Sequence, residues 1–219
     1  MKFRTPRRRL RWSSLAGTLL LIVATLMTIS APANANWWGI THYYDTCGAW
    51  GNITDDKNVS FHYADASAEL RAATNVVRTE LLDPTDLNTS YDQVQNVNTD
   101  VVMVDRYYTD WCEDSMQAQW TTDGVFGIRG LTACYSTISI GRCNQAVVRI
   151  SNTHLDVHNG AGDRFLVCHE VGHAVGLRHR SAVNGCMRQN VDISDRVYTP
   201  HDSGHINSTW ANEPASGTE

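Results

Sequence analysis

The segment from His169 to His179 reads H-E-x-x-H-x-x-G-x-x-H, and it constrains the chain more than any other feature. On an α-helix, His169 and His173 lie one turn apart and project from the same face. Gly176 permits backbone angles that other residues avoid, so we expect the helix to end there and the chain to turn back. That turn would bring His179 toward the first two imidazoles. Three neutral imidazole nitrogens with one open position are typical of a catalytic zinc site.

Glu170 follows the first histidine and is placed to reach a water at the metal without binding the metal itself. A match to all five fixed positions is expected by coincidence in about one chain of this length in ten thousand. Two other interpretations stay open: an ordinary amphipathic helix, and a zinc site that has lost its chemistry. The glutamate favours a catalytic site over both.

A short loop after the third histidine leads to Asn184-Gly185-Cys186-Met187, in which Asn-Gly favours a turn. Together with the upstream motif, this segment resembles the metzincin clan of zinc endopeptidases, over residues 162–190. The resemblance implies an α+β fold: a mixed β-sheet with an active-site helix, a Met-turn at Met187 and a C-terminal helix. The alternative for this methionine is a place in the ordinary core.

The resemblance also implies the chemistry. One catalytic Zn2+ would be held by His169, His173 and His179, and Glu170 would act as general base toward a zinc-bound water that hydrolyses a peptide bond. The chain departs from the better-known families at two places. Gln189 stands where astacins and serralysins have a tyrosine ligand, and Arg180 follows the third histidine. The clan is therefore indicated and the subfamily is not.

Metzincins bind an extended peptide against the edge strand above the metal, a form of β-augmentation. The resemblance implies that Leu131, Thr132 and Ala133, after Gly130, form this strand and bind substrate. The alternative is an ordinary interior strand. Expected partners are thus proteins or peptides.

Alternation and capping residues predict the remaining elements. We expect strands at 58–63, 101–104, 131–136 and 145–150, a helix at 68–82 after the capping residues Asp65 and Ser67, a loop at 159–162 before the active-site helix, and a last helix near 201–210.

The N-terminus carries basic residues, then an apolar run and the small residues Ala31-Pro32-Ala33-Asn34-Ala35. This layout predicts a secretory signal peptide at 1–35, a single catalytic domain at 36–211 and a disordered tail at 212–219. The apolar run is short for a spanning helix, so we expect a secreted protein without a stable membrane anchor.

Removal of residues 1–35 takes six of the 18 basic residues and none of the 23 acidic ones, which leaves a net charge of −11 (12 basic against 23 acidic). So acidic a domain is a poor candidate for binding nucleic acid. Nothing in the sequence predicts an oligomeric state.

All six cysteines lie after residue 35, which predicts three disulfides in an exported chain. The resemblance brings the segments before the first histidine and before Met187 together, and so implies a Cys168–Cys186 bridge. Cys134 and Cys143 could close a local loop, leaving Cys47 with Cys112. The alternative for Cys47 is a zymogen switch that holds the zinc.

Two further histidine pairs have helical spacing. His154 and His158 precede Asp163, which with Gly160 and Gly162 could hold a second, structural metal such as Ca2+. A polar loop leading into the helix explains these residues equally well. His201 and His205 lie in the last predicted helix, where we expect His201 and Asp202 to cap the helix rather than bind metal.

A secreted zinc endopeptidase is the function that these patterns favour. A zinc amidohydrolase acting on cell-wall peptides and a disulfide-stapled, zinc-binding module without turnover are the alternatives.

Overall fold

The structure, a computed structural model, describes residues 43–45, 48–50, 53–107, 129–139, 141–152, 160–180, 184–188 and 194–211. The predicted signal peptide and tail lie outside these residues, as do Cys47, Cys112, His154, His158 and Gln189.

One sheet contains all the described strands. They are β1 (Tyr43–Asp45), β2 (Gly48–Trp50), β3 (Ile53–Thr54), β4 (Asn58–His62), β5 (Asn88–Tyr91), β6 (Val101–Arg106), β7 (Gly130–Ser139) and β8 (Arg142–Ser151). Their order is β1-β2-β7-β8-β6-β4-β5, with β3 paired to β8 beside this path. The pairs β4–β5, β4–β6, β6–β8 and β3–β8 are parallel, whereas β7 runs antiparallel to β8 and β2. The predicted mixed sheet is confirmed.

The two central strands, β6 and β8, are buried over runs of consecutive residues, whose side chains alternate between the two faces of the sheet. In β8, every residue from Ala146 to Ser151 is buried, and in β6 the run Val101–Met103 is buried. The predicted strands at 58–63, 101–104, 131–136 and 145–150 are all present, and three of them extend further than alternation indicated.

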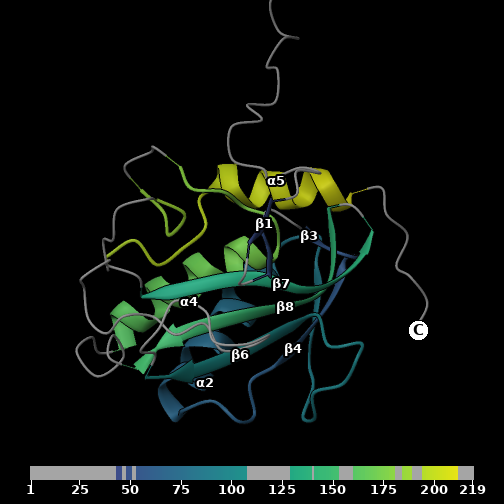
Figure 1. The fold of residues 1–219 in the computed structure, drawn as a ribbon. Coiled ribbons are helices and arrows are strands. Elements are labelled where there is room, and N and C mark those ends of the chain that lie inside the picture. The colour runs from purple at the N-terminus through teal and green to yellow at the C-terminus, as the bar shows by residue number, and fades with distance from the viewer. Residues whose placement is uncertain are drawn as a thin grey trace, which may run out of the picture. The chain divides into compact units, whose positions relative to one another are not determined.

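Three α-helices lie among the described residues: α2 (Ala68–Val76), α4 (Gly160–Ala174) and α5 (Pro200–Trp210). Helix α2 packs against α4 and β6, and α4 packs against β7 and β8, so both helices cover the same face of the sheet (Figure 1). No described helix has the length and apolar character needed to cross a membrane.

The helix predicted at 68–82 begins where expected, because the Ser67 side chain accepts a hydrogen bond from the Leu70 backbone N–H. Its second half, Val77–Leu82, is a π-helix rather than an α-helix. The predicted loop at 159–162 is wrong in part: α4 already begins at Gly160. Glycine adopts helical angles as well as turn angles, so its presence did not distinguish the two.

Candidate metal centre

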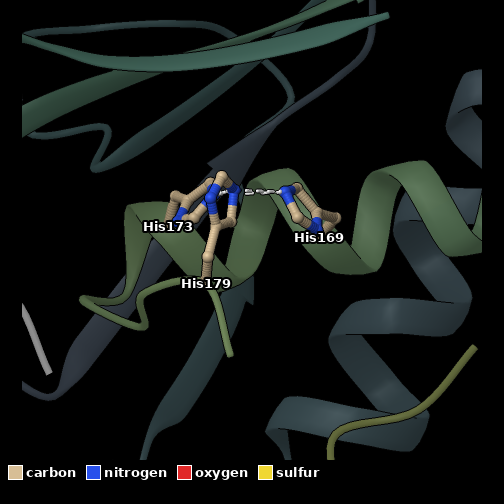
Figure 2. A group of neighbouring side chains, drawn as sticks. All are labelled: His169, His173 and His179. Atoms are coloured by element: carbon tan, nitrogen blue, oxygen red, sulfur yellow. Dashed lines mark hydrogen bonds between the residues drawn. The ribbon is translucent and has the colours of Figure 1, made fainter. Parts of the chain in front are cut away.

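Helix α4 and the turn after it place the three motif histidines. His169 and His173 lie one turn apart, and the helix ends at Ala174. Gly176 has a φ of 98°, a value that favours glycine, and the Leu177 N–H donates to the Gly172 carbonyl at 2.8 Å. The chain then turns back and brings His179 over the helix, as Figure 2 shows. The predicted role of the glycine is confirmed.

The three Nε2 atoms form a small triangle. They are 2.9 Å apart between His169 and His179, 3.2 Å between His169 and His173, and 3.1 Å between His173 and His179. Two zinc–nitrogen bonds of about 2.0–2.1 Å at a tetrahedral angle separate their nitrogens by about 3.3 Å. The triangle is therefore close to one face of a tetrahedral site, and this group could hold a metal ion.

Backbone carbonyls fix the orientation of two of these rings. His169 Nδ1 lies 2.7 Å from the Cys186 carbonyl, and His173 Nδ1 lies 2.7 Å from the Leu177 carbonyl. A carbonyl can only accept, so each Nδ1 carries the proton and donates it. Each Nε2 is then left with a lone pair directed at the centre of the triangle.

Burial keeps the imidazoles neutral, which is the form that binds metal. It lowers the pKa of His169 to about 4, although the hydrogen bond to Cys186 opposes the shift. Burial also lowers the pKa of His173 well below its usual value, and the other two histidines add to this effect. His179 is more exposed than the other two, and its partial burial also lowers its pKa.

Glu170 is buried beneath strand β7. The Thr132 hydroxyl lies 2.9 Å from Oε2 and 2.7 Å from the Glu170 backbone carbonyl. Burial raises the pKa of Glu170 to about 8, and the hydrogen bond from Thr132 partly offsets this. At Gly130, a Cβ would lie 2.5 Å from Cγ and Oε1 of the glutamate, so only glycine leaves this side chain its space.

The first part of β7 is an edge in the described part of the chain. It pairs with β8 on one side, whereas β2 reaches it on the other side only through the pair Ala49–Cys134. Leu131 and Ala133 are buried, and Thr132, which alternates with them, turns its hydroxyl toward Glu170. The expected edge at Gly130–Ala133 is present, but the Thr132 side chain contacts the glutamate, a contact that the sequence did not indicate.

Met187 lies directly under the helix that carries the histidines. Its side chain is fully buried, and a Cβ added at Gly172, between the two α4 histidines, would overlap its sulfur. Gly185 takes a φ of 86°, which the turn before the methionine requires. The Met187 carbonyl accepts from the Arg180 N–H at 2.8 Å. The methionine therefore sits in a tight turn against the helix, as predicted.

Two cysteine pairs are at disulfide distance, with Cα–Cα separations of 5.9 Å for Cys168–Cys186 and 5.6 Å for Cys134–Cys143. Both predicted pairings are confirmed. The first joins α4 to the turn beneath it, and the Tyr198 hydroxyl donates to the Cys168 carbonyl at 2.9 Å at the same place.

Arg180 connects the end of the motif to helix α5. Its guanidinium donates to Thr199 Oγ1 at 2.6 Å and lies 3.4 Å from Asp202 Oδ1, and both members of this ion pair are largely buried. It also reaches the Asn184 carbonyl and side chain. An arginine after the third histidine thus has a clear structural role, which its position in the motif alone did not reveal.

One prediction about helix α5 is wrong in part. Helix α5 is capped by Thr199, which forms a capping box with Asp202, so the expected capping role is confirmed for Asp202 and wrong for His201. His201 is exposed instead. Asp163 lies inside the first turn of α4 and is buried, and burial followed by the charge of Glu69 raises its pKa to about 6.

Across the described ranges, the three motif histidines are the one group of three or more His, Cys, Asp or Glu residues with metal-binding spacing. The contact of Thr132 with Glu170 is a site feature that the sequence did not indicate. The place of Met187 under the helix was predicted, but its close fit against Gly172 was not. Gly172, which lies between the two histidines of α4, was a signal for the contact with Met187. No protein-family model matches the chain, and comparison with curated proteins finds no match.

Proposed function

We propose that the protein is a secreted zinc endopeptidase of the metzincin type. The observation that carries this proposal is the triangle of Nε2 atoms from His169, His173 and His179, 2.9–3.2 Å apart, with the buried Glu170 next to the first ligand. Two disulfides are compatible with an extracellular protein.

The donor set supports zinc. Three neutral imidazoles suit Zn2+ far better than Ca2+ or Mg2+, which prefer oxygen ligands. Three protein ligands also leave a coordination position open, as catalytic zinc sites do. When bound, the ion would supply a Lewis acid that activates water and polarises a peptide carbonyl.

Glu170 has the properties of a proton carrier for this reaction. It would take a proton from water as the water oxygen bonds to the carbonyl carbon, and pass that proton to the nitrogen as the C–N bond breaks. Burial raises its pKa to about 8, which makes the carboxylate basic enough for this task near neutral pH. Thr132 holds the carboxylate, and Gly130 leaves room for it.

The substrate class is argued from β7. Its first four residues, Gly130–Ala133, run above α4. They pair with β8 on one side, and no described strand pairs with them on the other side. An extended peptide can add to such an edge through backbone hydrogen bonds. The order of strand, helix, further strands and histidine helix is the one that the metzincin resemblance implies.

Peptidase activity of the purified chain from residue 36 on a mixed peptide library tests the proposal, with and without 1,10-phenanthroline. Glu170→Gln is the matched variant, since it keeps size and metal ligands. We expect chelator-sensitive cleavage that falls by about 10²–10⁴-fold in the variant, with unchanged zinc content.

Cleavage of cell-wall peptides but not of the library would instead identify an amidohydrolase. Stoichiometric zinc without turnover of any substrate would favour a binding module. Near-normal turnover in Glu170→Gln would contradict the proposed role of the glutamate.

A further inference from the structure

Helix α5 carries a second pair of histidines at helical spacing. The buried side of the helix consists of Asp202, Ile206 and Trp210. His201 and His205 lie one turn apart at other positions of the helix, where His201 is exposed and His205 is half-buried. This pair plays no part in the proposed peptidase reaction.

The geometry of this pair matches that of the motif histidines on α4. The two Nε2 atoms of His201 and His205 lie 3.2 Å apart, the same distance as between His169 and His173. The ring centroids are 4.5 Å apart and the rings are inclined by 85°, compared with 4.8 Å and 87° on α4. The α5 pair is therefore oriented as the first two ligands of the metal centre are.

A chelating distance follows from the metal chemistry. Two metal–nitrogen bonds of about 2.0–2.1 Å place their nitrogens about 2.9 Å apart at a right angle and about 3.3 Å apart at a tetrahedral angle. The observed 3.2 Å lies within this range. One N–H···N hydrogen bond between the rings would give a similar distance, so the experiment has to separate the two.

The helix that carries the pair is fixed at several points. Thr199 and Asp202 close a capping box at its start, and the buried Trp210 anchors its end, where the Arg142 guanidinium lies 4.9 Å from the ring centroid. Between them, Asn207 Oδ1 accepts from the Asp86 N–H at 2.9 Å. A held helix keeps the two imidazoles in register before any ion arrives, which lowers the entropic cost of chelation.

We propose that His201 and His205 form a second metal site, which chelates one divalent transition-metal ion through their two Nε2 atoms. Imidazole ligands select Cu2+, Ni2+ and Zn2+ over Ca2+ and Mg2+, and Cu2+ binds most tightly of these. With two protein ligands, the site binds more weakly than the three-histidine centre.

A Cu2+ titration of the zinc-loaded chain tests this proposal. The wild type is compared with His205→Ala and with the double variant Ser203→His/His205→Ala, which keeps the number of histidines but changes their spacing from four residues to two. Residues two apart on a helix do not face each other. Copper bound and zinc released are both measured, so that displacement at the three-histidine centre is counted separately. Circular dichroism confirms that each variant is folded.

We expect the wild type to bind one more Cu2+ ion than either variant without releasing zinc, with at least about tenfold tighter binding at this position. The electron paramagnetic resonance spectrum of this extra copper should show coupling to two nitrogens. Equal copper binding in all three proteins would overturn the proposal and leave a hydrogen-bonded pair. Extra copper in the wild type that is matched by released zinc would overturn it as well.

Discussion

Helices α4 and α5 each carry two histidines four residues apart, with Nε2 atoms 3.2 Å apart, yet they differ in everything around the rings. On α4, a third histidine closes the triangle, backbone carbonyls hold Nδ1 of two rings, and a buried glutamate lies alongside. On α5, the first histidine of the pair faces solvent. Helical spacing is thus enough to create a chelating pair, whereas a reactive centre needs contacts from distant parts of the chain.

The largest expected effect is a difference in zinc retention between variants of the α4 histidines and of the α5 histidines. His173→Ala removes one of the three ligands and should lower the zinc affinity of the α4 centre. The decrease should exceed the roughly 10- to 100-fold that is typical when only a hydrogen-bond partner of a ligand is lost. In His205→Ala, the tightly held ion should remain. Zinc content after dialysis against a weak chelator measures this difference. Equal loss in both variants would show that the two helices share one metal site.

A smaller effect concerns the contact between β7 and α4. Thr132→Val removes the hydroxyl and should lower kcat by roughly 10- to 100-fold with little change in KM, because a hydrogen bond to a charged group is worth about 1.5–3 kcal/mol. Thr132→Ser keeps the hydroxyl and should recover most of the activity. Steady-state kinetics and the pH profile of kcat test this. A higher KM at constant kcat would mean that the side chain binds peptide, as the sequence indicated, and does not position Glu170.

Two glycines test how closely each helix is packed. Gly172→Ala should destabilise the protein by roughly 1–3 kcal/mol, since the new methyl group overlaps Met187. Gly204→Ala, next to His205, meets no atom within 4 Å and should stabilise α5 by about 0.5–1 kcal/mol. Urea denaturation of the two variants gives both values. A stabilising Gly172→Ala would show that Met187 is not held against the helix.

Mild acid should increase the contribution that the buried Asp100 makes to the stability of the fold. Asp100 accepts from the Ser60 N–H at 2.6 Å, and burial, aided by the charge of Asp55, raises its pKa from 3.8 to about 7. Between these values the folded state binds more protons than the unfolded state. The contribution of Asp100 to stability therefore grows as pH falls from about 7 toward 4, by about 1.4 kcal/mol per pH unit at most.

Unfolding of the metal-free protein at pH 7 and pH 5 measures this slope. Asp100→Asn keeps an acceptor oxygen for Ser60 and should flatten the slope. An unchanged slope in this variant would mean that other groups control the acid response.

The sequence predicted those parts of the site that are local in the chain. The spacing of His169, His173 and His179, the turn at Gly176 and the Ser67 cap each depend on neighbours within about one or two helical turns. The disulfide between Cys168 and Cys186 was implied by the metzincin resemblance rather than by spacing.

The remaining features depend on packing that no local pattern encodes. Thr132 and Glu170 are 38 residues apart, and their contact exists only once β7 crosses α4. Helix α5 begins at Pro200, one residue earlier than expected, so Thr199 and not His201 occupies the capping position. The π-helix at 77–82 likewise has no distinct periodic signal in so short a segment.

The bridge between Cys168 and Cys186 encloses the candidate metal centre within one covalent ring. His169, Glu170, His173 and His179 all lie within the ring of backbone that this bridge closes. A single cut of the backbone between the two cysteines would open the ring without separating its parts. Every metal ligand would stay on one connected molecule, so a nick in this segment removes a peptide bond but does not release a piece of the site.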